Sequence, residues 1–243
     1  PRSTRSPMTN PKPAQQVAWL RRRLLAWGRD NFRHFAWRSD RDLFRVLVTE
    51  LLLKQTGAER VSTLRDAVLT RYPSPVTLAQ ADPDELRKLI TPLGFARQRS
   101  EQLVSLAKRL SDMPVLPRRR EDLMNLPGVG PYTAAAAACF AWGRREAALD
   151  VNVARIVSRY FGVRLVRGEE RRNSLIRDLA GQVIAGEGPR QVNWALLDLG
   201  ALVCRPRPRC HVCPLERRCI RADASPGAAD PVMKAGPTPV ILG

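Results

Sequence analysis

The chain has 243 residues, enough for one large domain or two small ones, and 44% of them are hydrophobic, which permits a sizeable core. Lysine and arginine number 41 against 23 acidic residues, giving a formal net charge of +18. This excess favours a polyanionic partner, with nucleic acid ahead of an anionic membrane, over a basic surface that is merely solvated. No apolar run approaches the roughly 18 residues of a membrane span, so we expect no membrane-embedded segment.

Both ends of the chain are rich in proline and small or charged residues. This composition predicts flexible, disordered tails at residues 1–13 and 222–243. The start lacks the apolar centre of a secretory signal peptide, which favours a cytoplasmic, nucleoid-associated protein. Four of the five cysteines fall within residues 204–219, and in a reducing compartment such clustering indicates metal ligation rather than disulfides.

Between the tails the hydrophobic pattern is helical throughout, and it predicts an all-α fold of about ten short helices. The first helix places Val17, Leu20, Leu24 and Trp27 on one face. Residues 42–56, DLFRVLVTELLLKQT, are apolar nearly all round and predict a central buried helix. Prolines and glycines separate the further expected helices, at 58–71, 83–90, 97–112, 120–125, 131–142, 151–161, 170–185 and 189–203.

A tight turn, LPGVG at residues 126–130, joins two of these helices. Gly128 and Gly130 allow positive φ and a close backbone approach to a ligand. The backbone N–H groups around Val129 and at the next helix N-terminus, together with the helix dipole, make an anion site that suits phosphate. The alternative is an ordinary turn between two helices, which the glycines alone would favour.

Asp150 follows Tyr132 by 18 positions, across one helix and one loop, and its type and position suit the N-cap of helix 151–161. The stretch LPGVGPYTAAAAACFAWG…ALDVNVARIVSRYFG resembles the helix-hairpin-helix signature of the DNA glycosylase superfamily that includes endonuclease III and the adenine glycosylase MutY. The resemblance covers about residues 15–220. Other segments correspond to the family in the same order: FAWR (35–38), TELLLKQT (49–56), LGFARQR (93–99) and NWALLDLGALVC (193–204).

The resemblance implies two helical lobes with the DNA cleft between them. One lobe would comprise residues 14–40 and 151–221 and carry the cysteine cluster. The other would be a six-helix lobe, residues 41–150, with the helix-hairpin-helix at 120–142. In the family the hairpin grips DNA phosphates, so the implied partner is double-stranded DNA with a mismatched or damaged base, bound by a monomer.

Base excision cleaves a glycosidic bond through a transition state with oxocarbenium character, which a carboxylate stabilises. The resemblance assigns that role to Asp150. At Tyr132 the bifunctional members carry a lysine that forms a Schiff base, so tyrosine implies a monofunctional glycosylase that leaves an abasic site. Glu50 interrupts an apolar helix and either borders a cavity or pairs with an arginine. The resemblance favours the first, with Glu50 transferring a proton to the departing base, and places Lys54 where the family inserts a side chain into the duplex. Gln55, at the end of the same helix, is a further candidate for DNA binding.

The clustered cysteines have the spacing C-x5-C-x2-C-x5-C, which suits either four-coordinate zinc or a [4Fe–4S] cluster and does not decide between them. These ligands would be Cys204, Cys210, Cys213 and Cys219. The resemblance favours the [4Fe–4S] cluster. The loop between the first two cysteines carries Arg205, Arg207 and Arg209. These arginines are either phosphate contacts or part of a solvated basic loop.

The sequence also bears on which base is removed. Adenine glycosylases usually carry a large C-terminal domain after the cluster, for which the tail here is too short. Tyr132 together with Asp150 most resembles the thymine–DNA mismatch glycosylases, which remove thymine or uracil opposite guanine. A MutY-like adenine glycosylase without the C-terminal domain, acting on adenine opposite guanine or oxoguanine, is the alternative. A non-catalytic hairpin DNA-binding protein is a third, and it would need neither Asp150 nor Glu50.

Overall fold

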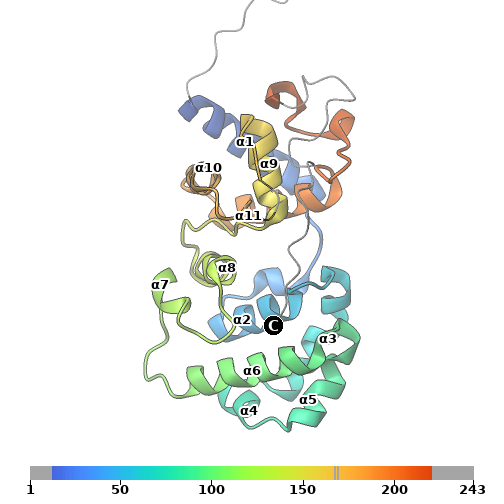
Figure 1. Ribbon diagram of the computed structural model, residues 1–243, viewed down its shortest axis with the longest axis vertical. Helices are drawn as coiled ribbons and strands as arrows, with labels where there is room; N and C mark the ends of the chain where they lie inside the picture. Colours follow the sequence, from blue (N-terminus) through green and yellow to red (C-terminus); the bar gives the residue numbers. More distant parts are fainter. Residues whose placement is uncertain (1–12, 167, 169, 221–243) are drawn as a thin grey trace, which may run out of the picture. The chain divides into compact units, whose positions relative to one another are not determined.

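The computed structural model describes residues 13–166, 168 and 170–220 (Figure 1). Within these ranges the secondary structure is helical and contains no strand, which confirms the all-α prediction for this part of the chain. The packing divides the chain into two units. Unit 1 runs up to Phe32 and resumes at Leu149, and unit 2 is the continuous segment Arg33–Ala148. Apart from Pro13, the tails expected at 1–13 and 222–243 lie outside the described residues.

The described part of unit 1 contains four α-helices: α1 (Pro13–Asn31), α9 (Val151–Phe161), α10 (Ser174–Ile184) and α11 (Pro189–Leu202). Both α1 and α9 pack against α10 and α11, so the first helix of the chain lies beside two of the last (Figure 1). Side chains from all four helices are fully buried and form the core: Leu20, Leu24, Val153, Val157, Ile184, Leu196 and Leu199. Of the predicted apolar face of α1, only Trp27 remains partly exposed.

Unit 2 contains seven helices: α2 (Leu43–Leu53), α3 (Ala58–Arg71), α4 (Pro75–Ala79), α5 (Pro83–Ile90), α6 (Ala96–Ser111), α7 (Arg120–Leu123) and α8 (Pro131–Trp142). Helix α2 packs against α3, α6 and α8, and nine of its 11 residues are buried. The predicted central buried helix is therefore confirmed. Helices α4 and α5 pack against α6, and α7 packs against α8.

Helix starts follow local chemistry. The carboxylates of Asp42, Asp82 and Asp150 accept hydrogen bonds from backbone N–H groups in the first turns of α2, α5 and α9. Proline occupies the beginning of α5, α8 and α11, where its missing N–H has no intrahelical acceptor to lose. Among the described residues, every helix is too short or too polar to cross a bilayer.

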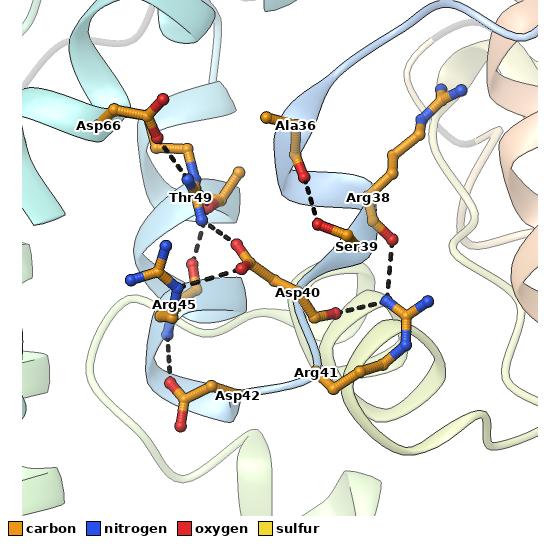
Figure 2. Close-up of polar contacts among 10 residues, drawn as sticks. Ala36, Arg38, Ser39, Asp40, Arg41, Asp42, Arg45, Thr49 and Asp66 are labelled. Carbon is orange, nitrogen blue, oxygen red and sulfur yellow. Dashed lines mark hydrogen bonds and ion pairs between the residues drawn. The ribbon is translucent and has the colours of Figure 1, made fainter.

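Asp40 ties the segment before α2 to the rest of unit 2 (Figure 2). Its carboxylate accepts a hydrogen bond from Arg45 Nε at 3.1 Å and pairs with the guanidinium of Arg65, which is 2% exposed. Arg65 also donates from Nε to Thr49 Oγ1 at 2.8 Å and from Nη1 to Asp66 at 2.6 Å. A buried guanidinium needs such partners because an unpaired charge in the interior is costly.

The unit boundaries differ slightly from those that the resemblance implied. It placed residues 33–40 with the first lobe and residues 149–150 with the second, whereas the packing does the reverse. The contacts of Asp40 explain the first difference. The second arises because Asp150 caps α9 and therefore stays with that helix.

Candidate active site

Asp150 stands at the N-terminus of α9 in unit 1 and is partly exposed. Its Oδ1 accepts a hydrogen bond from the Val153 N–H at 2.7 Å, which confirms the predicted capping role. Its Oδ2 accepts a hydrogen bond from Asn152 Nδ2 at 2.8 Å. Both oxygens are thus oriented by donors on α9, while the residue retains access to solvent.

Hydrogen bonds continue from Asn152 to the cysteine loop. Arg155 donates from Nη2 to Asn152 Oδ1 at 2.8 Å and to the Gly200 carbonyl at 3.1 Å, and from Nε to the Cys204 carbonyl at 2.8 Å. Burial lowers the pKa of Arg155 below its ordinary value, and the neighbouring Cys204 opposes this change in part. These hydrogen bonds connect Asp150 through Asn152 and Arg155 to the backbone of Cys204.

Sequence reasoning did not find Asn152 or Arg155. Their signal is faint. They are polar residues three positions apart on a helix whose other face is apolar, and such a pair is usually only a solvated face. Asn152 contacts Asp150 and Arg155 contacts Cys204, two residues with predicted roles. These contacts can be recognised only in the folded structure.

The four predicted metal ligands come together at the end of unit 1. Cys204, Cys210, Cys213 and Cys219 line one cavity of about 30 Å³, together with Arg159 and Val203. Burial, assisted by the other three cysteines, raises the pKa of the Cys213 thiol to about 11. In the described part of the chain no three His, Cys, Asp or Glu side chains are arranged to hold a single metal ion. Four thiols around one cavity are a donor set that suits either four-coordinate zinc or a [4Fe–4S] cluster.

Arg159 fastens the loop between the first two cysteines. The side chain is 5% exposed and donates from Nη1 to the Arg205 carbonyl at 2.6 Å and from Nη2 to the Pro206 carbonyl at 3.0 Å. Its Nη1 also lies 3.5 Å from Cys204 Sγ. Arg159 therefore holds the backbone that carries the first cysteine. Like Arg155, this residue was missed because α9 and the loop are distant in sequence.

The three predicted phosphate contacts in the same loop are exposed: Arg205, Arg207 and Arg209. Arg205 donates from Nε to the Ala201 carbonyl at 2.8 Å, which holds its side chain against the end of α11. The loop therefore presents several guanidinium groups to solvent from an anchored backbone, as phosphate binding requires.

The predicted hairpin lies in unit 2 between α7 and α8. Gly128 has φ of 73°, a conformation that favours glycine, and a Cβ atom there would lie 3.3 Å from the Leu51 side chain. Gly130 is extended and would have no heavy atom within 4 Å of an added Cβ, so the space beside it is open. Val129 is 6% exposed and its N–H donates to the Leu126 carbonyl at 3.1 Å, so the predicted contact of Val129 with a phosphate is not supported by either group. No side chain caps the N-terminus of α8.

The other two predicted catalytic residues are also in unit 2. Tyr132 stands in the first turn of α8 and is partly exposed, and Glu50 lies in α2 and is 6% exposed. Helices α2 and α8 pack against each other. The candidate catalytic residues are therefore divided between the units, with Asp150 on one and Tyr132 and Glu50 on the other.

Lys54, the residue predicted to enter the duplex, and Gln55, a further predicted DNA contact, have different surroundings. The Lys54 ammonium donates to the Gly128 carbonyl at 2.5 Å and so connects the end of α2 to the hairpin. Burial and, second, the charge of Arg99 lower the pKa of Lys54. Gln55 is exposed and has φ of 54°. Gln55 is thus the side chain of the two that is available to DNA.

Comparison with known proteins identifies the family of the chain. A family model described as HhH-GPD superfamily base excision DNA repair protein matches residues 48–181. The thymine/uracil-DNA glycosylase of Methanothermobacter thermautotrophicus is 35% identical over 81% of this chain and 89% of its own length. The adenine DNA glycosylase of Mycobacterium tuberculosis is 37% identical over 79% of this chain and 64% of its own length. The solved structure of a thermostable thymine-DNA glycosylase matches with a TM-score of 0.78 and 31% identity, covering 85% of this chain and 96% of that one. The chain belongs to the HhH-GPD superfamily of base excision DNA repair proteins.

Proposed function

We propose that this protein is a monofunctional DNA glycosylase that extrudes and removes thymine or uracil opposite guanine in double-stranded DNA, leaving an abasic site. The observation that carries the proposal is Asp150, a solvent-accessible carboxylate whose two oxygens are both oriented by hydrogen bonds. The base specificity is supported by the similarity to thymine/uracil-DNA glycosylases over most of both chains.

Asp150 suits a glycosidic transition state because a carboxylate stabilises the positive charge that develops on the sugar as the base departs. The carboxylate accepts hydrogen bonds from Val153 N–H and from Asn152, which fix its direction without supplying a proton. A fixed negative charge needs no reorganisation when the bond breaks. The base itself must leave the stack to reach this group.

Tyr132 supports the absence of lyase chemistry. A phenol cannot form the Schiff base that β-elimination through a lysine requires. The lysine nearest in the hairpin region, Lys54, has its ammonium engaged with the Gly128 carbonyl. Glu50 is the second acid in this proposal and transfers a proton to the departing base, since this residue is 6% exposed in α2, the helix that packs against the helix of Tyr132.

The hairpin and the basic loop would hold the DNA backbone. At the hairpin, the open space beside Gly130 and the uncapped start of α8 suit a phosphate oxygen. At the loop, the exposed guanidinium groups of Arg205, Arg207 and Arg209 suit further phosphates. Such contacts position the duplex without reading its sequence.

A [4Fe–4S] cluster is the cofactor that we propose for the four cysteines, with zinc as the alternative. The cavity that the four cysteines line supports a metal centre at this place. Its role would be structural, since it would cross-link the chain after α11. The test is the purified protein itself: stoichiometric iron with a broad visible band is expected, and a colourless protein with stoichiometric zinc would contradict the assignment.

The activity test is a panel of labelled duplexes that carry G·T, G·U, A·oxoguanine or A·G pairs, each incubated with the protein and then treated with alkali. Alkali-dependent nicking at thymine or uracil opposite guanine is expected. Nicking at adenine would favour the MutY-like alternative, which the 37% identity to the mycobacterial enzyme makes a real competitor. Binding without nicking on any duplex would favour the non-catalytic alternative.

A further inference from the structure

Two turns in unit 2 hold side chains in a strained backbone conformation. Gln55 has φ of 54° and Phe95 has φ of 50°, and no other non-glycine residue between 13 and 220, residues 167 and 169 apart, has a positive φ. This conformation is unfavourable for residues with a Cβ atom and persists where surrounding contacts enforce it, most often at functional sites. Gln55 is exposed, and Phe95 is 64% exposed although it is a large aromatic residue.

One buried guanidinium connects the two turns. Arg99, on α6, is 5% exposed and donates from Nη1 to the Gly94 carbonyl at 2.5 Å, directly before Phe95. Its Nη2 donates to the Lys54 carbonyl at 2.5 Å and to Thr56 Oγ1 at 3.0 Å, on either side of Gln55. Because both turns bind the same planar group, neither can relax without breaking these bonds.

A second contact joins the turns directly. The hydroxyl of Thr56 donates to the Leu93 carbonyl at 2.9 Å, while Thr56 also accepts from Arg99. The turn after α2 and the turn before α6 are therefore held together by Arg99 and Thr56. We call these two turns, residues 54–56 and 93–95, the paired turns.

The positive charge of Arg99 does not stabilise the folded state through an ion pair. Within the described residues its side-chain partners are carbonyl and hydroxyl oxygens, and no carboxylate pairs with it. Lys54 is a second cation close enough to be affected, since Arg99 contributes to the lowering of its pKa after burial. Burying a cation beside another one without an acid weakens folding. A polyanion in front of the paired turns would supply the missing negative charge.

We infer that Arg99 is a positioning residue for base extrusion, which holds Gln55 and Phe95 ready as one rigid unit before the DNA strand opens. The inference rests on the proposed glycosylase function and deepens it. Arg99 acts through backbone carbonyls and does not need to touch the base. Its benefit is preorganisation, because ordering two exposed turns only when DNA binds would consume binding energy.

The test compares Arg99→Met, which keeps an unbranched side chain but removes every donor, with Lys108→Met, which removes an exposed cation from the same helix. Single-turnover rates are measured on a duplex with thymine opposite guanine and on one with thymine opposite an abasic-site analogue, where extrusion is easier. Arg99→Met should slow the first reaction on the order of tenfold to a hundredfold and the second much less. Lys108→Met should change neither, and Arg99→Lys should lie between the other two variants.

If Arg99 only stabilised the fold, Arg99→Met would lower the excision rate equally on both duplexes, and that result would overturn the inference. So would an Arg99→Met rate on the G·T duplex equal to that of the unaltered protein. Fluorescence of 2-aminopurine placed beside the mismatch provides a direct readout of extrusion. It should rise less with Arg99→Met than with Lys108→Met when both proteins saturate the duplex.

A second experiment does not depend on activity. Gln55→Gly removes the left-handed strain and should raise the unfolding midpoint by about 2 to 4 °C, but only while Arg99 enforces the strain. In the Arg99→Met background the gain should disappear. Equal gains in both backgrounds would contradict the clamping role. If the unaltered protein were inactive on every duplex, the proposed function and the role of Arg99 in base extrusion would both fail. The unfolding midpoints of the Gln55→Gly variants would still show whether Arg99 enforces the strained conformation of Gln55.

Discussion

A Cβ atom on Gly200 of α11 would lie 2.7 Å from the Cβ of Asn152 on α9. Real Cβ atoms do not approach so closely, so glycine is what permits these two helices to pack here. Asn152 in turn orients Asp150, and the Gly200 carbonyl accepts a hydrogen bond from Arg155. The packing of two core helices thus determines where the candidate catalytic carboxylate points.

Gly200→Ala should therefore destabilise the protein by about 1 to 3 kcal/mol and also lower kcat, because Asn152 must move. The matched control is Gly181→Ala in α10, where an added Cβ meets nothing within 4 Å. That variant should gain about 0.5 to 1 kcal/mol from helix propensity and keep its activity. Urea unfolding and single-turnover kinetics measure both. Similar behaviour of the two variants would contradict the contact.

Asn152→Ala removes the donor to Asp150 Oδ2 without disturbing the helix cap at Oδ1. A hydrogen bond to a charged group contributes about 1.5 to 3 kcal/mol, so kcat should fall on the order of tenfold or more if the bond orients the carboxylate in the transition state. The control is Asn173→Ala, which removes the N-cap of α10. It should cost about 1 kcal/mol of stability and leave kcat unchanged.

Asp150→Asn separates the two roles of this residue, because asparagine caps helices as well as aspartate but carries no charge. The unfolding midpoint should change little, while the excision rate should fall by a factor on the order of a hundred or more. Asp150→Ala should lose the cap as well, at a further cost of about 1 kcal/mol. An Asp150→Asn protein with full activity would remove Asp150 from the mechanism.

Tyr132→Lys places an amine at the position where the bifunctional relatives carry one. The variant should form a covalent complex with substrate DNA that borohydride traps, and should nick the strand without alkali. The unaltered protein should do neither. Tyr132→Met serves as the control for loss of the phenol, and any trapped complex with that variant would point to a different lysine.

Lys54 makes stability depend on pH. Its folded-state pKa is lowered below the ordinary 10.5, mainly by burial, so the unfolded chain binds this proton more tightly than the folded one. Between the folded-state pKa and 10.5 the unfolded state holds more protons, and the contribution to stability therefore rises with pH. Lys54→Met should show a smaller rise in urea unfolding free energy on approaching pH 10.5 than the unaltered protein. Equal slopes would contradict this assignment.

The helices could be predicted from local signals, because aspartate caps, first-turn prolines and apolar periodicity act within a few residues. Helix α4 was missed. It has only five residues, and Pro73 and Pro75 indicated a break. In the structure Ser74 and Thr77 exchange hydrogen bonds in a capping box, and Pro75 takes a position in the first turn where its missing N–H costs nothing.

The candidate site could be predicted only where a residue type carries the chemistry. Asp150 and the four cysteines stand out by type and spacing, and the structure places the cysteines around one cavity. The residues that orient them could not be predicted. Arg155 reaches Cys204 across 49 positions and Arg99 reaches Lys54 across 45. Such contacts are set by how helices pack, and no local pattern encodes them.

The membership of α1 in unit 1 has a consequence for biosynthesis. Unit 2 is one uninterrupted segment, so it can complete its folding as soon as Ala148 has left the ribosome. Helix α1 is translated before unit 2, yet it packs against α10 and α11, which are translated after unit 2. Its apolar face therefore lacks these partners while unit 2 is being translated. Closing a contact of such long sequence separation is slow, so assembly of unit 1 is the step at which a nascent chain is most open to aggregation or chaperone binding.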